Sequence, residues 1–254
     1  MKTIQQFFST LPLLMKGFGF IFRNKMQWFL LIPFIINIIL YMGGFFIMES
    51  VFHSLQSYFE VSIKSYFSDG MFRFVSGFLH VLIQVLYFLL FLIYGGFLML
   101  MVLSPVLSYV SEKTEKIVTG KDSGSFKFTQ FLNDFWRGLK LTFRNMFLET
   151  GILILMFFIG FIPVINLFIP IVLFFVTAYF YGFSFMDYQN ERNGLTVKES
   201  IAFVRNNKGL AAGSGALFTF ALMIPIIGAA LGGMVSIAFV VAITVKLNNQ
   251  HIKR

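Results

Sequence analysis

Two uncharged stretches of equal length constrain what this chain can fold into. Thr150–Met186 and Gly209–Val245 each run for 37 residues without Asp, Glu, Lys or Arg. A single transmembrane helix needs only about 20 apolar residues to cross a hydrocarbon core of ~30 Å. Proline interrupts both stretches near their first third, at Pro163 and at Pro225. Each stretch is therefore predicted to be a helical hairpin that turns at its proline.

The first limb of the first hairpin is short. Thr150 to Ile162 holds 13 residues, which reach only ~20 Å as a helix. We therefore expect the tip between Pro163 and Pro170 to lie inside the membrane, where turning backbone must be covered by protein or water. Many transporters build a substrate site from helix ends that meet near the midplane. The candidate substrate-contacting residues at the two tips are Pro163, Asn166, Pro225 and Gly228.

These tip residues have two interpretations. The one we favour is structural, because proline and asparagine end helices. The alternative is that N–H groups freed at broken helix ends face a permeating anion, since a helix N-terminus carries partial positive charge.

The composition places the chain in the membrane. Apolar residues make up 57% of it and charged residues 12%, against about 25% charged in a soluble domain, and the mean hydropathy is +0.82. The absence of cysteine excludes disulfides, thiolate metal sites and cysteine nucleophiles. The net charge of +9 comes from basic residues in short segments between spans, so we expect a lipid bilayer and no nucleic acid as partner.

The prediction is one integral membrane domain, residues 1–254, of the all-α class, with two long transmembrane helices, two proline-broken hairpins and amphipathic surface helices. Its expected parts are an amphipathic N-terminal segment (1–27), a span (28–48), an extracytoplasmic amphipathic segment (49–73), a long span (74–111), a cytoplasmic helical region (112–149), a hairpin (150–186), a connector (187–208) and a second hairpin (209–245).

Three details of these parts are open to test. The long span is either one helix or a helix kinked near Gly95-Gly96 and ended by Ser104-Pro105. An apolar stripe from Phe128 to Phe147, opposite Arg137 and Arg144, predicts a helix lying on the membrane surface. In the connector, Thr196 followed by Glu199 predicts a capping box.

The loops predict the topology. Basic residues number four in 1–27, seven in 112–149, four in 187–208 and three in 246–254, but two in 49–73. The positive-inside rule then places both termini in the cytoplasm and 49–73 on the opposite side.

Candidate chemistry is sparse. No ionisable residue lies centrally in the expected spans, which favours passive conduction or a non-transport role. No nucleophile–base set or metal-ligand spacing occurs, so neither an enzyme nor a cofactor is predicted. Gly213-Ser214-Gly215 and the G-x-x-x-G of Gly228 to Gly233 are predicted to pack helices closely, within one subunit or between two.

Short motifs in a fixed order cover nearly the whole chain, and together they resemble the CysZ-type sulfate permease family, the bacterial relatives of the etoposide-induced membrane proteins. The matching stretches are Ile32-Pro33-Phe34-Ile35-Ile36-Asn37, Ser104-Pro105, Ser111-Glu112-Lys113, Glu115, Gly120, Ile162-Pro163-Val164-Ile165-Asn166, Asp187-Tyr188, Arg192-Asn193-Gly194-Leu195 and Ile224-Pro225.

The resemblance implies two long transmembrane helices with membrane-dipping hairpins, in a homo-oligomer that conducts sulfate across the bacterial inner membrane. The family's sulfate-binding stretch resembles Pro-Gly-Leu-Arg-Arg just before the first span. Here Gln27 and Trp28 replace the paired arginines, with Arg23 and Lys25 close by. Arg23, Lys25 and Gln27 are therefore the candidate entrance residues for an anion. The alternative is a membrane scaffold or interaction protein of the same family, which the missing arginine pair favours.

Overall fold

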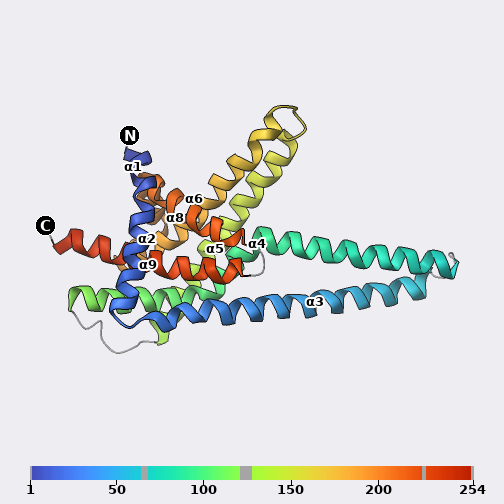
Figure 1. Ribbon diagram of the computed structural model, residues 1–254, viewed down its shortest axis with the longest axis horizontal. Helices are drawn as coiled ribbons and strands as arrows, with labels where there is room; N and C mark the ends of the chain where they lie inside the picture. Colours follow the sequence, from blue (N-terminus) through green and yellow to red (C-terminus); the bar gives the residue numbers. More distant parts are fainter. Residues whose placement is uncertain (1, 64–67, 121–127, 225–226, 253–254) are drawn as a thin grey trace. The chain divides into compact units, whose positions relative to one another are not determined.

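A computed structural model describes residues 2–63, 68–120, 128–224 and 227–252, and every element in these ranges is helical. Figure 1 shows their arrangement. The elements are α1 (Lys2–Phe8), α2 (Thr10–Arg23), the 3-10 helix η1 (Gln27–Leu31), α3 (Ile32–Ile63), α4 (Asp69–Thr119), α5 (Phe128–Ile159), the 3-10 helix η3 (Ile165–Phe168), α6 (Ile169–Arg192), α7 (Val197–Asn206), α8 (Lys208–Leu222) and α9 (Gly228–Ile252).

Six helical segments within these ranges are long and apolar enough to cross a membrane. They are 27–58, 70–91, 94–119, 135–159, 165–191 and 228–248. The predicted all-α membrane class is therefore confirmed. The chain forms two compact units, one of residues 37–95 and the other of residues 1–36 with 96–254, and α4 contributes to both.

The smaller unit, Asn37–Gly95, is an antiparallel hairpin made by the later part of α3 and the first part of α4. Near its open end the Tyr87 hydroxyl donates a hydrogen bond of 3.3 Å to the Tyr41 carbonyl. Further along, the side chains of His80 and Gln84 share a hydrogen bond of 2.7 Å. Helix α3 continues into the segment 49–73, which was predicted to be amphipathic, and ends at Ile63. That part of the segment is not a separate element.

The larger unit is built on close contact between α6 and α8, and glycine allows that contact. A β-carbon on Gly182 of α6 would collide with the Ala211 carbonyl oxygen in α8, and one on Gly215 of α8 would collide with the Ala178 carbonyl oxygen in α6. Small residues let helix backbones approach in this way. The predicted packing role of Gly213-Ser214-Gly215 is confirmed.

Close packing at glycines also joins α9 to its neighbours. A β-carbon on Gly232 would lie 3.0 Å from the side chains of Leu222 and Phe218 in α8. Gly17 of α2 lies against the Ala238 carbonyl in α9. The G-x-x-x-G motif at the start of α9 therefore makes close contacts inside one chain.

The long span is one helix, α4, which continues through Pro105 and ends at Thr119. Proline has no N–H to donate to the carbonyl four residues before it, and here that carbonyl belongs to Met101. The Ser104 hydroxyl donates a hydrogen bond of 2.8 Å to it instead. A serine beside the proline thus satisfies the freed backbone group, and of the two alternatives the structure has the one long helix, without a stop at Ser104-Pro105.

The two predicted hairpins differ from each other in limb length. The first limb before Pro163 is part of α5, a helix of 32 residues, and not a separate limb of 13. The length argument for a tip inside the membrane therefore does not apply to the α5–α6 pair. It does apply to α8, which has 15 residues and reaches only ~22 Å.

Candidate functional site

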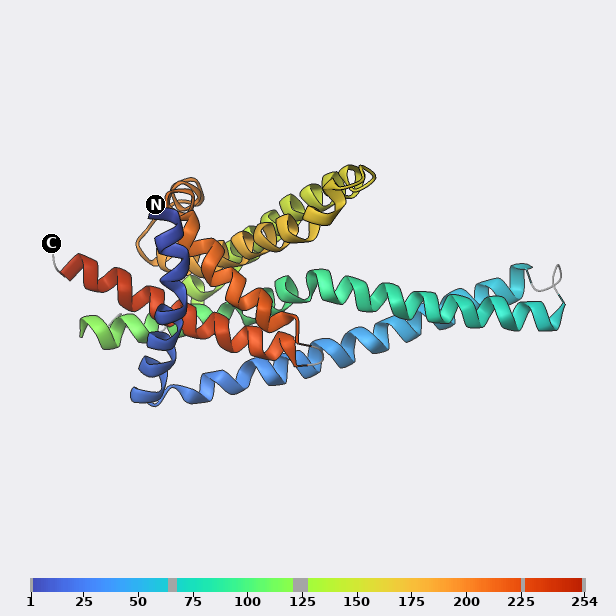
Figure 2. The same cartoon turned by 45° about the horizontal axis from the view of Figure 1, so that its top comes forward.

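Polar side chains line one face of α5 where it runs antiparallel to α6, and Figure 2 shows the two helices side by side. Residues separated by four or eight positions lie on one side of a helix. Their partners follow in reverse order along α6. We call this set the polar seam, and its members are Arg137, Arg144, Asn145 and Glu149 of α5 and Thr177, Ser184 and Asp187 of α6.

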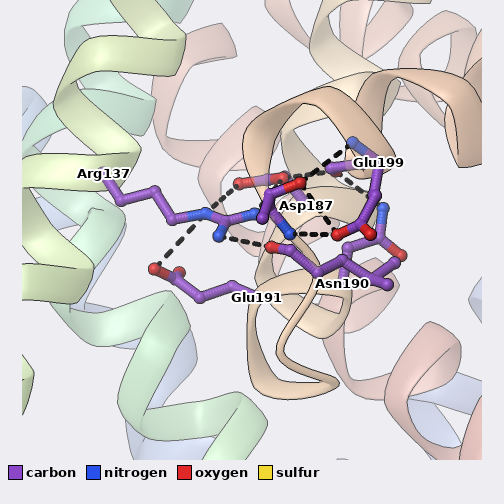
Figure 3. A network of polar contacts seen from close by, with 8 residues as sticks. Arg137, Asp187, Asn190, Glu191 and Glu199 are labelled. Carbon is purple, nitrogen blue, oxygen red and sulfur yellow. Dashed lines mark hydrogen bonds and ion pairs between the residues drawn. The ribbon is translucent and has the colours of Figure 1, made fainter.

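The first end of the polar seam is an ion pair with two hydrogen bonds (Figure 3). Arg137 donates from Nη2 to Asp187 Oδ1 over 3.1 Å and from Nε to Asp187 Oδ2 over 3.3 Å. Its Nη1 donates to the Leu195 carbonyl over 2.7 Å, and its Nε lies 3.4 Å from Glu191 Oε1. The planar guanidinium matches a carboxylate in this way. The charge of Arg137 is therefore balanced inside the protein.

Asp187 also ties α7 to this cluster. Its side chain is 6% exposed, and the Ser200 hydroxyl donates to Oδ1 over 2.5 Å. Asn190 Nδ2 donates to the Ser200 hydroxyl over 2.9 Å. A buried charge persists where hydrogen bonds satisfy it, and Asp187 is satisfied by Arg137 of α5 and by Ser200 of α7.

The predicted capping box at the start of α7 is confirmed. Glu199 N–H donates to the Thr196 hydroxyl oxygen, and Thr196 N–H donates to Glu199 Oε2 over 2.8 Å. The backbone N–H and the hydroxyl of Thr196 lower the pKa of the Glu199 carboxyl below its usual value.

The middle of the polar seam holds Arg144, whose surroundings differ from those of Arg137. Asn145 Nδ2 donates to the Ser184 hydroxyl over 3.5 Å, and Arg144 Nη1 donates to Asn145 Oδ1 over 3.1 Å. The Arg144 guanidinium lies 5.7 Å from the centroid of the Phe183 ring. In the part of the chain that the structure describes, Arg144 forms no ion pair with a carboxylate.

A second arginine, Arg205, lies in the last turn of α7 and is exposed. Arg205 likewise forms no ion pair with a carboxylate within the described ranges. Arg144 is therefore the arginine of the polar seam whose charge no carboxylate balances among the described residues.

The other end of the polar seam is a buried carboxyl. Glu149 is 5% exposed, and the Thr177 hydroxyl donates to its Oε1 over 2.5 Å. Its Oε2 has no hydrogen-bond partner among the described residues. Glu149 lies well inside the segment 135–159, which is long enough to cross a membrane. The expectation that no ionisable residue lies centrally in a span is therefore wrong.

The orientation of α5 reverses the predicted one. Phe147 is 68% exposed and Trp136 is 55% exposed, whereas Leu141 is buried beside the polar seam. The polar face of α5 thus packs against α6, and its aromatic side chains face outward. A helix with its polar face to water, as on a membrane surface, was expected, and that expectation is wrong because α5 continues directly into the hairpin.

The candidate entrance residues lie together at the turn between α2 and η1. Arg23 ends α2, Lys25 has a φ of 56°, and Gln27 begins η1. All three are exposed. This turn is one locus, and it is distinct from the polar seam in sequence and in helix membership.

The candidate tip residues do not join that turn. Pro163 and Asn166 are exposed at the end of the α5–α6 pair, which projects away from the α2–η1 turn in Figures 1 and 2. Gly228 begins α9, buried against the Leu222 carbonyl. Pro225 lies outside the described residues. The structure thus places the predicted site residues at separate positions.

No group of three or more His, Asp or Glu side chains in the described ranges is arranged to hold a metal ion. The chemistry of the polar seam is instead that of hydrogen-bond donors and charge. Six membrane-length segments and an inward-facing polar contact between two of them define a polytopic α-helical membrane protein with a polar interior.

A sequence model of the family described as Sulfate transporter CysZ/Etoposide-induced protein 2.4 matches residues 13–231. The match runs from α2 into α9 and includes the whole polar seam. The chain therefore belongs to this family, and the resemblance stated from its motifs is confirmed. At family level it is a membrane protein of the sulfate-transporter type.

Proposed function

We propose that this protein moves sulfate, or a similar inorganic oxyanion, passively across a bacterial inner membrane. The proposal includes a homo-oligomer whose subunits have both termini in the cytoplasm. Its support at family level is the match to a sulfate transporter family. The structural observation that supports it is Arg144, which Asn145 and Phe183 hold in the polar seam and which forms no ion pair with a carboxylate among the described residues.

The chemistry of an oxyanion explains why Arg144 is suited to bind one. Sulfate and its relatives are best bound by charge-assisted donors, and the planar guanidinium supplies two donors in a fixed geometry. Arg137 is engaged by Asp187 and Glu191, so its charge is already balanced. Arg144 is anchored by Asn145 and Phe183, neither of which neutralises it. Arg144 is therefore held in place and keeps an unbalanced charge for an anion.

This arrangement offers a substitute for the missing arginine pair. The resemblance predicts two arginines before the first span, where this chain has Gln27 and Trp28. We propose that Arg144 provides a guanidinium contact to the anion. Arg23, Lys25 and Gln27 would gather anions at an entrance, and the hairpin tips at Pro163, Asn166, Pro225 and Gly228 would border the path.

Transport through the polar seam needs α5 and α6 to separate, because Asn145 and Ser184 contact each other in this structure. An anion between the helices would take over donors that these side chains now share. Passive movement would make the flux follow the sulfate gradient and reverse with it.

The test is uptake of radiolabelled sulfate by proteoliposomes that contain the purified protein, with phosphate and chloride as competitors and protein-free liposomes as control. The expected result is saturable uptake that sulfate inhibits best. No selective flux in a monodisperse, correctly inserted preparation would overturn the proposal. A stoichiometric protein partner captured from the membrane extract would then favour the scaffold alternative.

A further inference from the structure

Glu149 is the group in the polar seam that the proposed function does not use. Its carboxyl is buried between α5 and α6, and its Oε2 has no hydrogen-bond partner in the described part of the chain. Native structures leave few buried polar atoms unpaired, and such atoms occur at functional positions. An ionisable residue inside a membrane segment points the same way.

The surroundings of Glu149 decide its charge. A lone buried carboxylate is very costly unless a cation or several donors compensate it, and otherwise the group takes up a proton. The one hydrogen bond to Glu149 comes from the neutral Thr177 hydroxyl. Tyr181 of α6 is a titratable group on which the Glu149 carboxyl acts, and Arg144, the nearest charged residue along α5, forms no ion pair with Glu149.

A bound metal cation fits this position poorly. Sodium, magnesium and calcium are coordinated by about six oxygens, whereas Glu149 and Thr177 supply three between them. A proton needs only one oxygen. Since Thr177 donates to Oε1, the proton would lie on Oε2, the oxygen without a partner.

We propose that Glu149 binds a proton on Oε2 and, as a neutral acid, donates a hydrogen bond to a deprotonated oxyanion that enters the polar seam. This inference rests on the proposed function, and it adds a substrate-contacting residue and a condition for conduction. The neutral acid would act together with Arg144, five residues earlier on α5. An ionised Glu149 would repel a dianion at the same place. Conduction therefore requires the protonated form.

The proposal predicts that sulfate flux falls as the pH rises. Raising the pH removes the proton from Glu149, and the resulting carboxylate opposes the anion, so sulfate flux falls. Glutamine has nearly the same shape, stays neutral and keeps a donor. Glu149→Gln should therefore conduct at all pH values tested, with the pH-dependent fall abolished, whereas Glu149→Leu should lose most of the flux.

The experiment measures sulfate flux in proteoliposomes against pH for the wild type, Glu149→Gln and Glu149→Leu. Glu199→Gln, an exposed change outside the spans, is the matched control and should keep the wild-type profile. Equal monodispersity on size exclusion shows that each variant is folded. An unchanged pH profile in Glu149→Gln would overturn the proposal, as would full flux in Glu149→Leu.

A second measurement separates this proposal from the proposed function. Infrared difference spectra between acid and alkaline pH should show the carbonyl band of a protonated carboxyl group in the wild type, and this band should be absent in Glu149→Gln. The readout needs no transport. A band without sulfate flux would defeat the proposed function but keep the proton site, and flux without the band would defeat the proton site alone.

Discussion

Gly215 of α8 lies directly against the carbonyl oxygen of Ala178 in α6, with no space for a β-carbon between them. The reciprocal contact joins Gly182 of α6 to Ala211 of α8. These two contacts hold α8 against the opposite side of the helix that supplies Thr177 and Ser184. The position of the polar seam therefore depends in part on Gly215, a residue of a helix that has no part in the seam.

Substitution of this glycine tests the contact. Gly215→Ala should lower the thermal stability in detergent, because overpacking a tight contact costs about 1–3 kcal/mol. Gly151→Ala makes the same chemical change on α5, where a β-carbon would meet nothing within 4 Å. That control should keep or raise the stability, since alanine is the better helix former. Equal melting temperatures for the two variants would contradict the close packing.

The Arg137–Asp187 pair makes a prediction about coupling. Arg137→Gln leaves Asp187 buried and unpaired, and loss of one partner of a buried pair costs about 3–5 kcal/mol. The double variant Arg137→Gln/Asp187→Asn removes both charges and should be more stable than Arg137→Gln alone. Thermal unfolding of the wild type, of the single variants Arg137→Gln and Asp187→Asn and of the double variant forms a double-mutant cycle. Additive losses of stability in the two single variants would show that Arg137 and Asp187 stabilise the fold independently.

Ionic strength separates the proposed entrance from the polar seam. Arg23→Gln/Lys25→Gln removes exposed charges, so its loss of sulfate flux should be largest at low salt and should fade as salt screens the surface. Arg144→Gln removes a half-buried contact group, so its loss should persist at high salt. Arg144→Lys should recover only part of the flux because it lacks the planar fork. The same salt dependence for both sites would contradict two separate roles.

The capping box gives a second pH prediction, outside the membrane segments. The pKa of Glu199 is lowered in the folded chain, so its contribution to the start of α7 is present above its usual pKa and is lost as pH falls through the lowered value. Amide hydrogen exchange at residues 197–200 should therefore quicken at acid pH. Glu199→Gln cannot ionise, so it should show no such step. A step retained in that variant would assign the effect to another group.

The natural absence of cysteine permits accessibility mapping without background. Because α5 and α6 are each long enough to cross the bilayer, single cysteines at Val164 and Leu167 should react with a membrane-impermeant thiol reagent from the side opposite to a cysteine at Lys198. Protection of the tip from both sides would instead support the membrane-dipping turn that the sequence suggested.

Much of the fold could be predicted because membrane insertion imposes strong rules. Charge-free runs and proline breaks indicated the helical class and the bend between α5 and α6. Small residues such as Gly215 indicated close helix packing. The family followed from short motifs in order, although no single motif was specific.

The polar seam could not be predicted, because the predicted segments were made to begin and end at charged residues. The boundaries after Glu149 and before Asp187 placed the α5 members of the seam in a different segment from their partners on α6. The spacing of Arg137, Asn145 and Glu149 on one helical face was present in the sequence. It was interpreted as a face toward water, because sequence alone does not show whether a polar face meets solvent or another helix.

The polar face of α5, which packs against α6, has a consequence for membrane insertion. If α5 left the translocation machinery alone, Arg137, Arg144 and Glu149 would meet lipid without their partners, at a large free-energy cost. With α6 already beside it, Asp187 balances Arg137 and Thr177 covers part of Glu149. The two helices should therefore enter the bilayer as a pair, and the short tip between them lets the ribosome deliver the second soon after the first.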